Sequence, residues 1–377
     1  MTSFGQPFFM VRAAFVPLLP PFMSALDGIE VETSVDAASV LRLRFNLSRN
    51  FLGDWDPPVA DVFRPLVPIT VAVSSGPPLP ETLINGYVRE VRQAGRGAAS
   101  GTTAEVVAMD ATATLMNLIE QPMPHPNMDP ATIATIIFGR YAITPMPLPT
   151  PPTRTIADTT TIQRGTDARM LREMARALSY ECYLQPDPIT GLDAGHFHPP
   201  LTAVPPQGVL SVDFGSATNV LDFDVTYDTL SPTTAVSAEA DPRSGVPVPA
   251  PALAPLMPPE GLEPALFRVI PPRVSRPTAR DAANPAELLR QNQAIVDRSS
   301  RALRASGTVD AVKYGRILRP GLPVLVRGAG RAYSGVWYVT SVTHSISTGA
   351  WTQRFSATRN ALGLTGAEIF IDPLAAL

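Results

Sequence analysis

The 377-residue chain has almost no lysine and almost no cysteine: Lys313 and Cys182 are the only ones. A lone cysteine cannot form an intrachain disulfide, and its scarcity favours folding in a reducing cytoplasm. Charged residues make up 17% of the chain, and the net charge is -3. This composition indicates no broad cationic surface, so we expect neither specific nucleic-acid binding nor attraction to an anionic membrane. The 45% apolar content excludes disorder of the whole chain.

Long apolar runs are also missing. Residues 4–23 are apolar, but Pro17, Pro20 and Pro21 interrupt them before they reach the roughly 18 residues that a membrane-spanning helix needs. No basic segment precedes them as in a signal peptide. We therefore expect no membrane anchor here, only an opening strand and loop.

Proline is the residue that stands out, with 42 copies. The prolines gather in two segments, Pro145–Thr153 and Asp241–Pro264. Neither segment has an apolar period, so we expect extended connectors or arms. They divide the chain into blocks.

The first block, residues 1–118, has the period of β-strands. Residues 41–47 alternate apolar side chains with polar ones, and residues 68–75, 82–93 and 102–110 follow the same pattern between Gly, Pro and Ser turns. This alternation predicts an antiparallel sheet or barrel with one wet face. The wet positions of the first strand are Arg42, Arg44 and Asn46.

Helices are first predicted in the middle block, residues 119–207. Asp129 and Pro130 form an N-cap and first-turn pair ahead of three isoleucines on one helical face. A second helix is expected behind Thr166 and Asp167, and residues 180–200 read as two short strands around a turn. The middle block is therefore expected to be α+β.

The C-terminal half repeats the β pattern around one helix. We expect strands at 208–240, a Pro-rich arm plus helix at 241–304, further strands at 305–362 and a tail at 363–377. Asn284, Pro285 and Glu287 predict the start of the helix as a capping box. Its expected apolar face consists of Leu288, Leu289, Ile295, Val296 and Leu303.

Two segments of the chain, residues 84–115 and 334–364, resemble each other. Each has two valines three residues apart, a polar turn that contains glycine, and a returning strand with an apolar-x-Ala pattern. The matched residues are Val88, Val91, Val106 and Ala108 with Val339, Val342, Phe355 and Ala357. The match fits either an internal duplication or two hairpins that converged on one pattern. A duplication would give two related β-units, so that three chains around an axis would present six similar units.

His344 is the first candidate for chemistry. Its strand alternation places it on one face with Val342 and Ile346. A hydrolase would use it as a general base with Ser341 or Ser345, but the chain has no G-x-S-x-G nucleophile elbow. We therefore interpret His344 as a structural strand residue.

Two further segments carry residues typical of a metal site and of a phosphate loop. His196 and His198 share a strand face, and Cys182 could lie across the hairpin from them, but no further ligand pair supports a metal site. The glycine-rich segment Gly328–Gly335 lacks the Lys-Ser/Thr of a phosphate loop and lies between strands, so it predicts a hairpin turn. We expect no metal, no cofactor and no catalytic residue.

Six arginines form the densest basic region. Without interleaved aromatic residues they favour a solvated helix face or a protein contact over nucleic acid; they are Arg298, Arg301, Arg304, Arg273, Arg276 and Arg280. Two acidic residues at the starts of helices, Asp110 and Asp167, are interpreted as helix caps.

Three segments resemble the phage late control protein D family, the hub of contractile-tail baseplates and related injection systems. Residues 161–184 with Gly195, Phe197 and Pro199 are similar to its helix, strand and return. Residues 319–360 are similar to its closing "R-P-G … G-x-Y-x-V-x-x-V-x-H … R-N" pattern, and 86–116 to the end of its first barrel.

The resemblance implies a mixed, β-rich fold with two tube-type antiparallel β-barrel domains and a helix-containing α+β middle block. It implies a homotrimer that forms a pseudo-sixfold ring between a hexameric inner tube protein and a trimeric spike protein, with other baseplate components as partners. Such a hub is assembled in the bacterial cytoplasm and becomes part of a tail or tail-like particle. Because the sequence ends at Leu377 without a repetitive tail, the spike is expected to be a separate protein, and the arm at 241–264 is expected to reach a neighbour.

The alternative is a hydrolytic enzyme of a tail-like particle. It would act on cell wall or peptide and would use His344.

Overall fold

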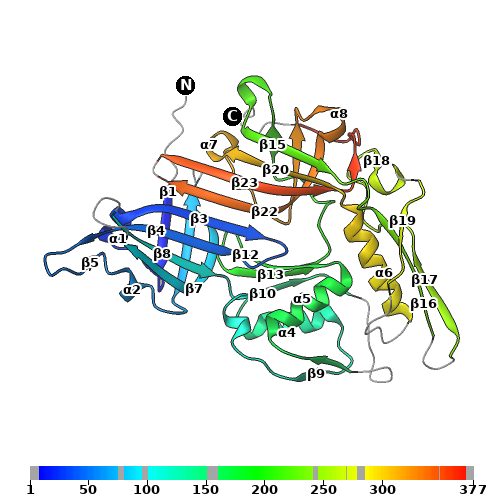
Figure 1. Ribbon diagram of the computed structural model, residues 1–377, viewed down its shortest axis with the longest axis horizontal. Helices are drawn as coiled ribbons and strands as arrows, with labels where there is room; N and C mark the ends of the chain where they lie inside the picture. Colours follow the sequence, from blue (N-terminus) through cyan, green and yellow to red (C-terminus); the bar gives the residue numbers. More distant parts are fainter. Residues whose placement is uncertain are drawn as a thin grey trace.

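The computed structural model describes residues 8–74, 80–95, 101–150, 160–240, 245–268, 270–277, 285–347 and 349–370. Strands, most of them paired antiparallel, are the commonest elements, with a few helices between them (Figure 1). The β-rich mixed fold expected from the sequence is confirmed. None of the described helices is long and apolar enough to cross a membrane.

The first β-unit contains the strands that the alternation predicts. Leu41, Leu43 and Phe45 are fully buried, because every second side chain of a strand points to the same face. The unit begins with the expected opening strand. Its elements are β1 (Phe8–Ala13), β2 (Val16–Pro17), α1 (Pro20–Ala25), β3 (Leu26–Ser34), β4 (Val40–Arg49), β5 (Trp55–Asp56), α2 (Val59–Val62), β6 (Pro68–Ser74), β7 (Glu81–Gly95) and β8 (Thr102–Met109).

The second β-unit is assembled from both ends of the C-terminal half. Trp337 and Phe355 fill its core. Its elements are β14 (Val209–Ser211), η2 (Gly215–Ala217), β15 (Val220–Tyr227), β20 (Leu303–Asp310), α7 (Ala311–Tyr314), β21 (Pro323–Arg327), α8 (Gly330–Tyr333), β22 (Gly335–Ser347), β23 (Ala350–Arg359) and β24 (Ala361–Leu362).

One sheet runs through both units. Strand β22 pairs with β3 in antiparallel register, with His344 opposite Val31. The resulting sheet of 14 strands has β15 at one end of its main path and β2 at the other. Figure 1 shows β22 and β23 above β3 and β4.

The middle block packs two helices against a small sheet. Asp129 caps the first helix by accepting a hydrogen bond from the Thr132 N–H, and Thr166 caps the second by accepting one from Arg169. Both expected helix starts are confirmed. The elements are η1 (Leu115–Asn117), β9 (Met123–His125), α4 (Pro130–Arg140), β10 (Thr144–Pro147), β11 (Thr161–Gln163), α5 (Asp167–Leu178), β12 (Glu181–Pro186) and β13 (Asp193–His198).

The first Pro-rich segment was predicted as a connector, and this is wrong for its beginning. Strand β10 pairs in parallel with β13 at the edge of the small sheet, a position where proline's missing N–H costs no ladder bond on the open side. Residues 151–159 of the expected connector lie outside the described residues.

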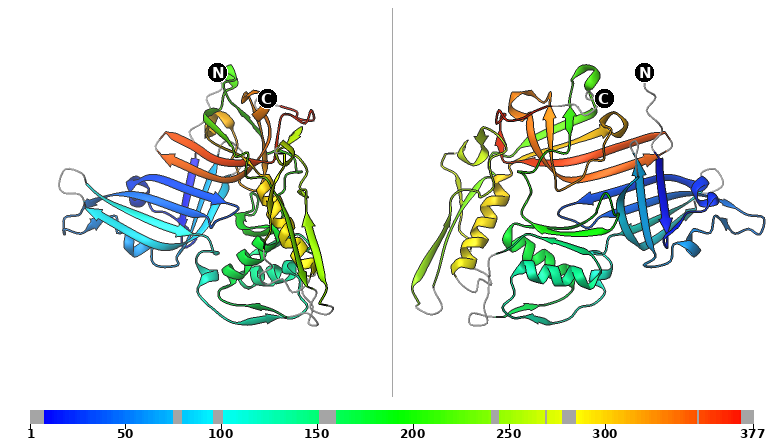
Figure 2. Two further views of the ribbon diagram at one scale, coloured as in Figure 1. Left: turned by 45° about the vertical axis from the view of Figure 1, so that its right-hand side comes forward. Right: turned by 180° about the vertical axis from the view of Figure 1, so that it is seen from behind.

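The second Pro-rich segment is half of a β-hairpin. Strand β17 pairs with β16 in antiparallel register, and the Ala252 and Ala235 side chains pack with Val296 of the helix. Figure 2 shows this arm and α6 at the opposite end of the molecule from the first β-unit. The elements are β16 (Thr233–Ala240), β17 (Pro247–Ala252), β18 (Glu263–Pro264), η3 (Ala265–Arg268), β19 (Arg273–Ser275) and α6 (Pro285–Ser300). Asn284 of the predicted capping box lies outside the described residues.

Candidate protein-interaction surface

The two β-units have the same strand order. In the first unit the order across the sheet is β3-β4-β8-β7-β6, and in the second it is β15-β20-β23-β22-β21. In both orders the strands also follow one another along the chain in the same sequence. Two hairpins that converged by chance would share one turn and two strands; five strands in one order are evidence of a duplication.

The register also agrees, pair by pair. In both units it slips at the same point, between Val88 and Glu90 and between Val339 and Ser341. The sequence match therefore reflects equivalent backbone positions. The corresponding pairs are Val88↔Ala108 with Val339↔Ala357, Val91↔Val106 with Val342↔Phe355, and Pro68↔Tyr87 with Pro323↔Tyr338.

The agreement extends to the turn that enters the sheet. The Leu66 N–H donates to the Val88 carbonyl at 2.8 Å, and the Gly321 N–H donates to the Val339 carbonyl at 2.9 Å. Leu66 and Gly321 both have positive φ, 61° and 80°. A non-glycine residue in this conformation is uncommon, so the first unit keeps a strained turn at the position where the second has glycine.

A continuous polar face crosses both units. Ser345 of β22 lies opposite Glu30 of β3, and Glu30 lies opposite Arg42 of β4. The Arg42 Nη1 and Glu30 Oε1 atoms are 2.5 Å apart. Both signs of charge are mixed along this face, which makes it a solvated wall without a strong field of one sign.

His344 lies on the other face of the same strand. It is 2% exposed, and burial lowers its pKa to about 3. Its neighbours Ser341 and Ser345 point to the polar face, because successive strand residues alternate. The base and nucleophile of the hydrolase alternative therefore lie on opposite sides of the sheet.

The two histidines of β13 meet each other but not the cysteine. His198 Nδ1–H donates to the Pro199 carbonyl at 2.8 Å, so its Nε2 accepts from His196 Nδ1–H at 3.2 Å. Burial lowers the pKa of His196 to about 4. Cys182 lies opposite Phe197, and the alternation turns it away from both imidazoles. No group of three metal-binding side chains occurs among the described residues.

The basic region is not one helical face, so that interpretation is wrong; contact with another protein stays a prediction. Helix α6 ends at Ser300, and Arg304 belongs to strand β20, because the chain turns into the sheet after the helix. Arg301 stacks on the Tyr338 ring at 4.4 Å. Together with Arg176, Asp297 and Glu181 these arginines line a cavity of about 230 Å³, and burial raises the pKa of Glu181 to about 7.

The other three arginines are not part of this group. Arg273 lies on β19, in the separate sheet of the arm, and the exposed Arg276 follows that strand. Arg280 lies outside the described residues. The glycine-rich segment Gly328–Gly335 connects the paired strands β21 and β22 as expected of a hairpin turn, with the single helical turn α8 inside it.

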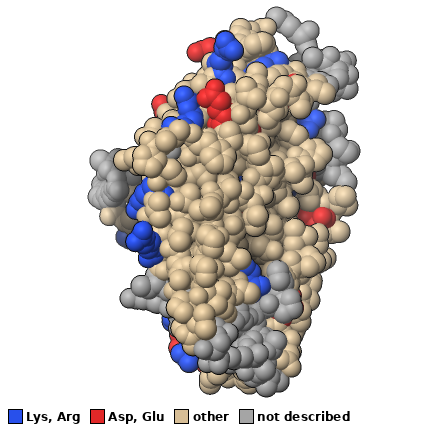
Figure 3. All heavy atoms as spheres, turned by 90° about the vertical axis from the view of Figure 1, so that its right-hand side faces the viewer, with Lys and Arg blue, Asp and Glu red and all other residues tan. Residues whose placement is uncertain are grey.

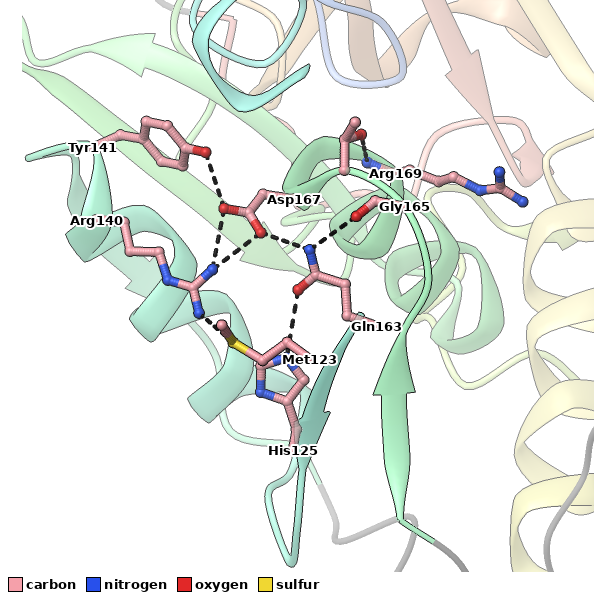
Figure 4. Close-up of polar contacts among 9 residues, drawn as sticks. Met123, His125, Arg140, Tyr141, Gln163, Gly165, Asp167 and Arg169 are labelled. Atoms are coloured by element: carbon pink, nitrogen blue, oxygen red, sulfur yellow. Dashed lines mark hydrogen bonds and ion pairs between the residues drawn. The ribbon is translucent and has the colours of Figure 1, made fainter. Parts of the chain in front are cut away.

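The two acidic residues expected to be caps hold other structures together. Asp110 accepts hydrogen bonds from the Ser39 and Thr112 N–H groups, at 2.7 and 2.9 Å, and so fixes the end of β8. Asp167 is the first residue of α5, not its cap. Figure 4 shows its carboxylate accepting from Arg140, Tyr141 and Gln163.

This Asp167 network is structural. Gln163 Nε2 donates to Asp167 at 2.7 Å, and Gln163 Oε1 lies 3.5 Å from His125. Burial and the Asp167 carboxylate raise the pKa of Tyr141 to about 12, so the phenol keeps its proton and donates. The network joins α4, α5 and the β9–β11 pair.

The arm presents a second surface, poor in charge. Figure 3 looks onto the side that carries α6 and the β16–β17 hairpin, and charged side chains are sparse across its middle. Several large apolar side chains of this region are more than half exposed, a property typical of contact surfaces. They are Leu253, Leu256, Leu262, Phe267 and Val274.

No protein-family model and no curated protein matches the chain. Among solved structures it is similar to the 43 kDa tail protein of prophage MuSo2 from Shewanella oneidensis, with a TM-score of 0.68 and 13% identity; the match covers 94% of this chain and 99% of that one. The tail protein from Neisseria meningitidis MC58 gives a TM-score of 0.64 at 12% identity, covering 94% and 97% of the two chains.

A third similar structure comes from a secretion system. It is the Escherichia coli protein described as a component of the type VI secretion system with structural similarity to the T4 bacteriophage tail proteins gp27 and gp5. Its TM-score is 0.55 at 11% identity, and the match covers 94% of this chain and 77% of that one. At these identities the comparisons establish a shared fold over nearly the whole chain.

Proposed function

We propose that the chain is the structural hub of the baseplate of a contractile phage tail or a related injection system. Three copies form a ring of six similar β-units, which joins a hexameric inner tube to a trimeric spike protein. The observation that carries the proposal is the equivalent register of the two β-units. A duplicated unit lets a threefold object present six similar surfaces.

Two further features support a structural role. The mixed charge of the polar face suits the wall of a passage, since it would neither trap nor repel cargo strongly. The candidate residues of the hydrolase alternative, His344 with Ser341 or Ser345, face opposite sides of one strand. The proposal includes the domain division expected from the sequence, in which residues 119–207 form a middle domain.

The native mass and the particle test this function. We expect the purified chain to have a mass of three times 40.2 kDa by light scattering, and a tagged chain to be recovered in tail-like particles with tube and spike proteins. A chain that stays monomeric and is absent from the particles would contradict the proposal.

The arm is proposed to contact a neighbouring subunit or another baseplate component through its exposed apolar side chains. Replacement of Leu256 and Phe267 by serine tests this, because both are more than half exposed and their loss costs the folded chain little. We expect fewer assembled particles with unchanged thermal stability of the chain. Normal particle yield would refute the role of the arm.

A further inference from the structure

Strand β22 divides one of its edges between two partners. Residues 335–338 pair with β21, and residues 341–347 pair with β3. Its counterpart in the first unit, β7, divides differently: Glu81–Tyr87 pair with β6, and no strand among the described residues pairs with the same edge of Arg89–Gly95. Half of this edge is thus open where the equivalent half of β22 is occupied.

The strand equivalent to β3 is open as well. Strand β3 lies between β4 and β22, whereas β15 pairs with β20 on one side and with no other strand among the described residues. The equivalence of β3 and β15 is close, because both ladders slip at the same point, between Leu26 and Gly28 and between Val220 and Asp222. Each chain therefore has two open strand edges, one on β7 and one on β15, that correspond to the two edges joined between β22 and β3.

We propose that Arg89–Gly95 of one copy pairs with β15 of the next copy, in the antiparallel register that joins β22 to β3. The inference rests on the proposed threefold assembly and names its interface. Superposing the registers pairs Ala94 with Asp224 and Arg92 with Thr226, as Ser345 pairs with Glu30 and Thr343 with Glu32. The Val35 N–H donates to the Thr340 carbonyl at 3.0 Å, so the Thr229 N–H is expected to donate to the next copy's Arg89 carbonyl.

The β7 edge carries both signs of charge: Arg92 pairs with Glu90 of its own strand, with Nε and Oε1 2.5 Å apart, and Glu90 would lie directly opposite Asp228 in the stated register. Arg89 and Arg92 are exposed on β7. Across the joint, Arg92 would have Asp224 and Asp228 as its diagonal neighbours, within reach of a long side chain. Charge does not select this register, because a slip by two residues would put Arg92 directly opposite Asp224 or Asp228; the register rests on the equivalence with the β22–β3 joint.

The side chains on the other face of the joint also fit. Val91 would lie opposite Tyr227, and Gly95 opposite Phe223. All but the exposed Gly95 are half-buried in the single chain. Pairing would cover their remaining apolar surface, as β3 covers Val342 and Ile346 on the equivalent joint.

The arm shows how this chain protects an edge that remains unpaired. In β17 every second residue is a proline, and Pro247, Pro249 and Pro251 fall at alternate positions of the ladder with β16. The prolines must therefore take the positions that do not bond to β16, which leaves the outer edge without N–H donors. Neither Arg89–Gly95 nor β15 contains a proline. Both edges keep the donors that a new strand would need.

Cysteine pairs test the joint directly. The variant Ala94→Cys/Asp224→Cys places one thiol on each edge, at exposed positions, and the native Cys182 is common to all variants. We expect oxidation to give covalent dimers and trimers on a denaturing gel that a reductant reverses, and nothing larger than a trimer. The intrachain pair Ser345→Cys/Glu30→Cys, which has the equivalent register, calibrates the reaction.

An off-register pair is the matched control. Ala94→Cys/Asp228→Cys displaces one thiol by four residues, about 13 Å along the strand, and should cross-link little. One result would refute the joint and leave the proposed function standing: a trimer by native mass in which Ala94→Cys/Asp224→Cys does not cross-link, although the calibrating pair does. A ladder that extends beyond three copies would also refute it. Cross-linked trimers that bind neither tube nor spike would support the joint and contradict the function.

Charge reversal gives a second readout that needs no cysteine. We expect Arg92→Glu to raise the concentration at which the trimer dissociates by about tenfold, and Asp224→Arg in the same chain to restore assembly. Arg354→Glu is the control, since Arg354 is exposed on the same sheet but on a strand with both edges paired. Equal effects of Arg92→Glu and Arg354→Glu would overturn the proposal.

Discussion

The two β-units share a backbone register but distribute side-chain volume differently. In the first unit Leu43 of β4 lies opposite Val106 of β8; at the equivalent place in the second, Gly307 lies opposite Phe355. Gly86 of β7 corresponds in the same way to Trp337. The comparison teaches that the register survives a change in which strand supplies the large side chain at a given place in the core.

The largest expected effect tests the side chain that carries this volume in the second unit. We expect Phe355→Ala to lower the free energy of unfolding by about 3–5 kcal/mol, because Phe355 is 1% exposed and its neighbour Gly307 has no side chain to fill the cavity. Urea denaturation at fixed protein concentration measures this. The matched variant Val106→Ala in the first unit should cost clearly less, and equal costs would break the comparison.

A smaller effect is expected at the glycines. A Cβ on Gly307 would lie 2.5 Å from the Asp222 carbonyl oxygen and 3.0 Å from the Phe355 ring, whereas a Cβ on Gly86 has no contact below 3.3 Å. We expect Gly307→Ala to cost about 1–3 kcal/mol by overpacking. Gly86→Ala should cost less than about 1 kcal/mol. Urea denaturation of both variants shows whether β20 must approach its neighbours closely at Gly307 and whether β7 tolerates a methyl group at Gly86.

The sequence was sufficient to predict the strands of both units, because alternation reports which side of a strand is buried. It also matched Val88 with Val339 and Val106 with Phe355 correctly, since the two valines three residues apart and the apolar-x-Ala spacing align the strands on either side of the turn. It could not predict the β22–β3 joint. The paired residues lie about 310 positions apart in the sequence, and neither strand has a sequence pattern from which its partner strand could be identified.

Two errors have local causes. The sequence placed Arg301, Arg304 and Leu303 on a helix, because the arginine spacing of three suits a helix as well as it suits a turn into a strand. The prediction for residues 241–264, an extended connector or arm, missed strand β17, because prolines hide its alternation. The pairing is seen only in the structure, where the residues between the prolines lie at the positions of β17 that can bond to β16.

The comparison also explains His344. Its counterpart in the first unit is Gln93, which is exposed; β3 pairs beside His344, whereas no strand that the structure describes pairs at the equivalent edge beside Gln93. Replacing His344 by its counterpart, His344→Gln, sharpens the comparison. The native pKa of His344 is lowered to about 3, so between that value and the unfolded value near 6.5 the unfolded chain binds the proton and the native chain does not.

Acidification through this window therefore destabilises the native chain. From pH 7 to pH 5 the loss from His344 is about 2 kcal/mol, and we expect His344→Gln to remove that part of the pH dependence. Urea denaturation at both pH values, compared between the two proteins, measures it. An unchanged pH dependence would show that His344 is not held neutral by burial.

The smallest expected effect concerns the polar face. Glu30 and Arg42 form an ion pair in the first unit, and their counterparts in the second, Asp224 and Ser306, cannot. The Glu30 and Arg42 side chains are 36% and 35% exposed, so water and salt screen the pair, and a double-mutant cycle with Glu30→Gln and Arg42→Gln should give a coupling of about 0.2–1 kcal/mol that shrinks in 1 M salt. A coupling well above this range, insensitive to salt, would mean that the face is shielded from solvent in the assembled protein. If the polar face is the wall of a passage, water must reach it on both units. This interpretation therefore requires a weak coupling that salt reduces.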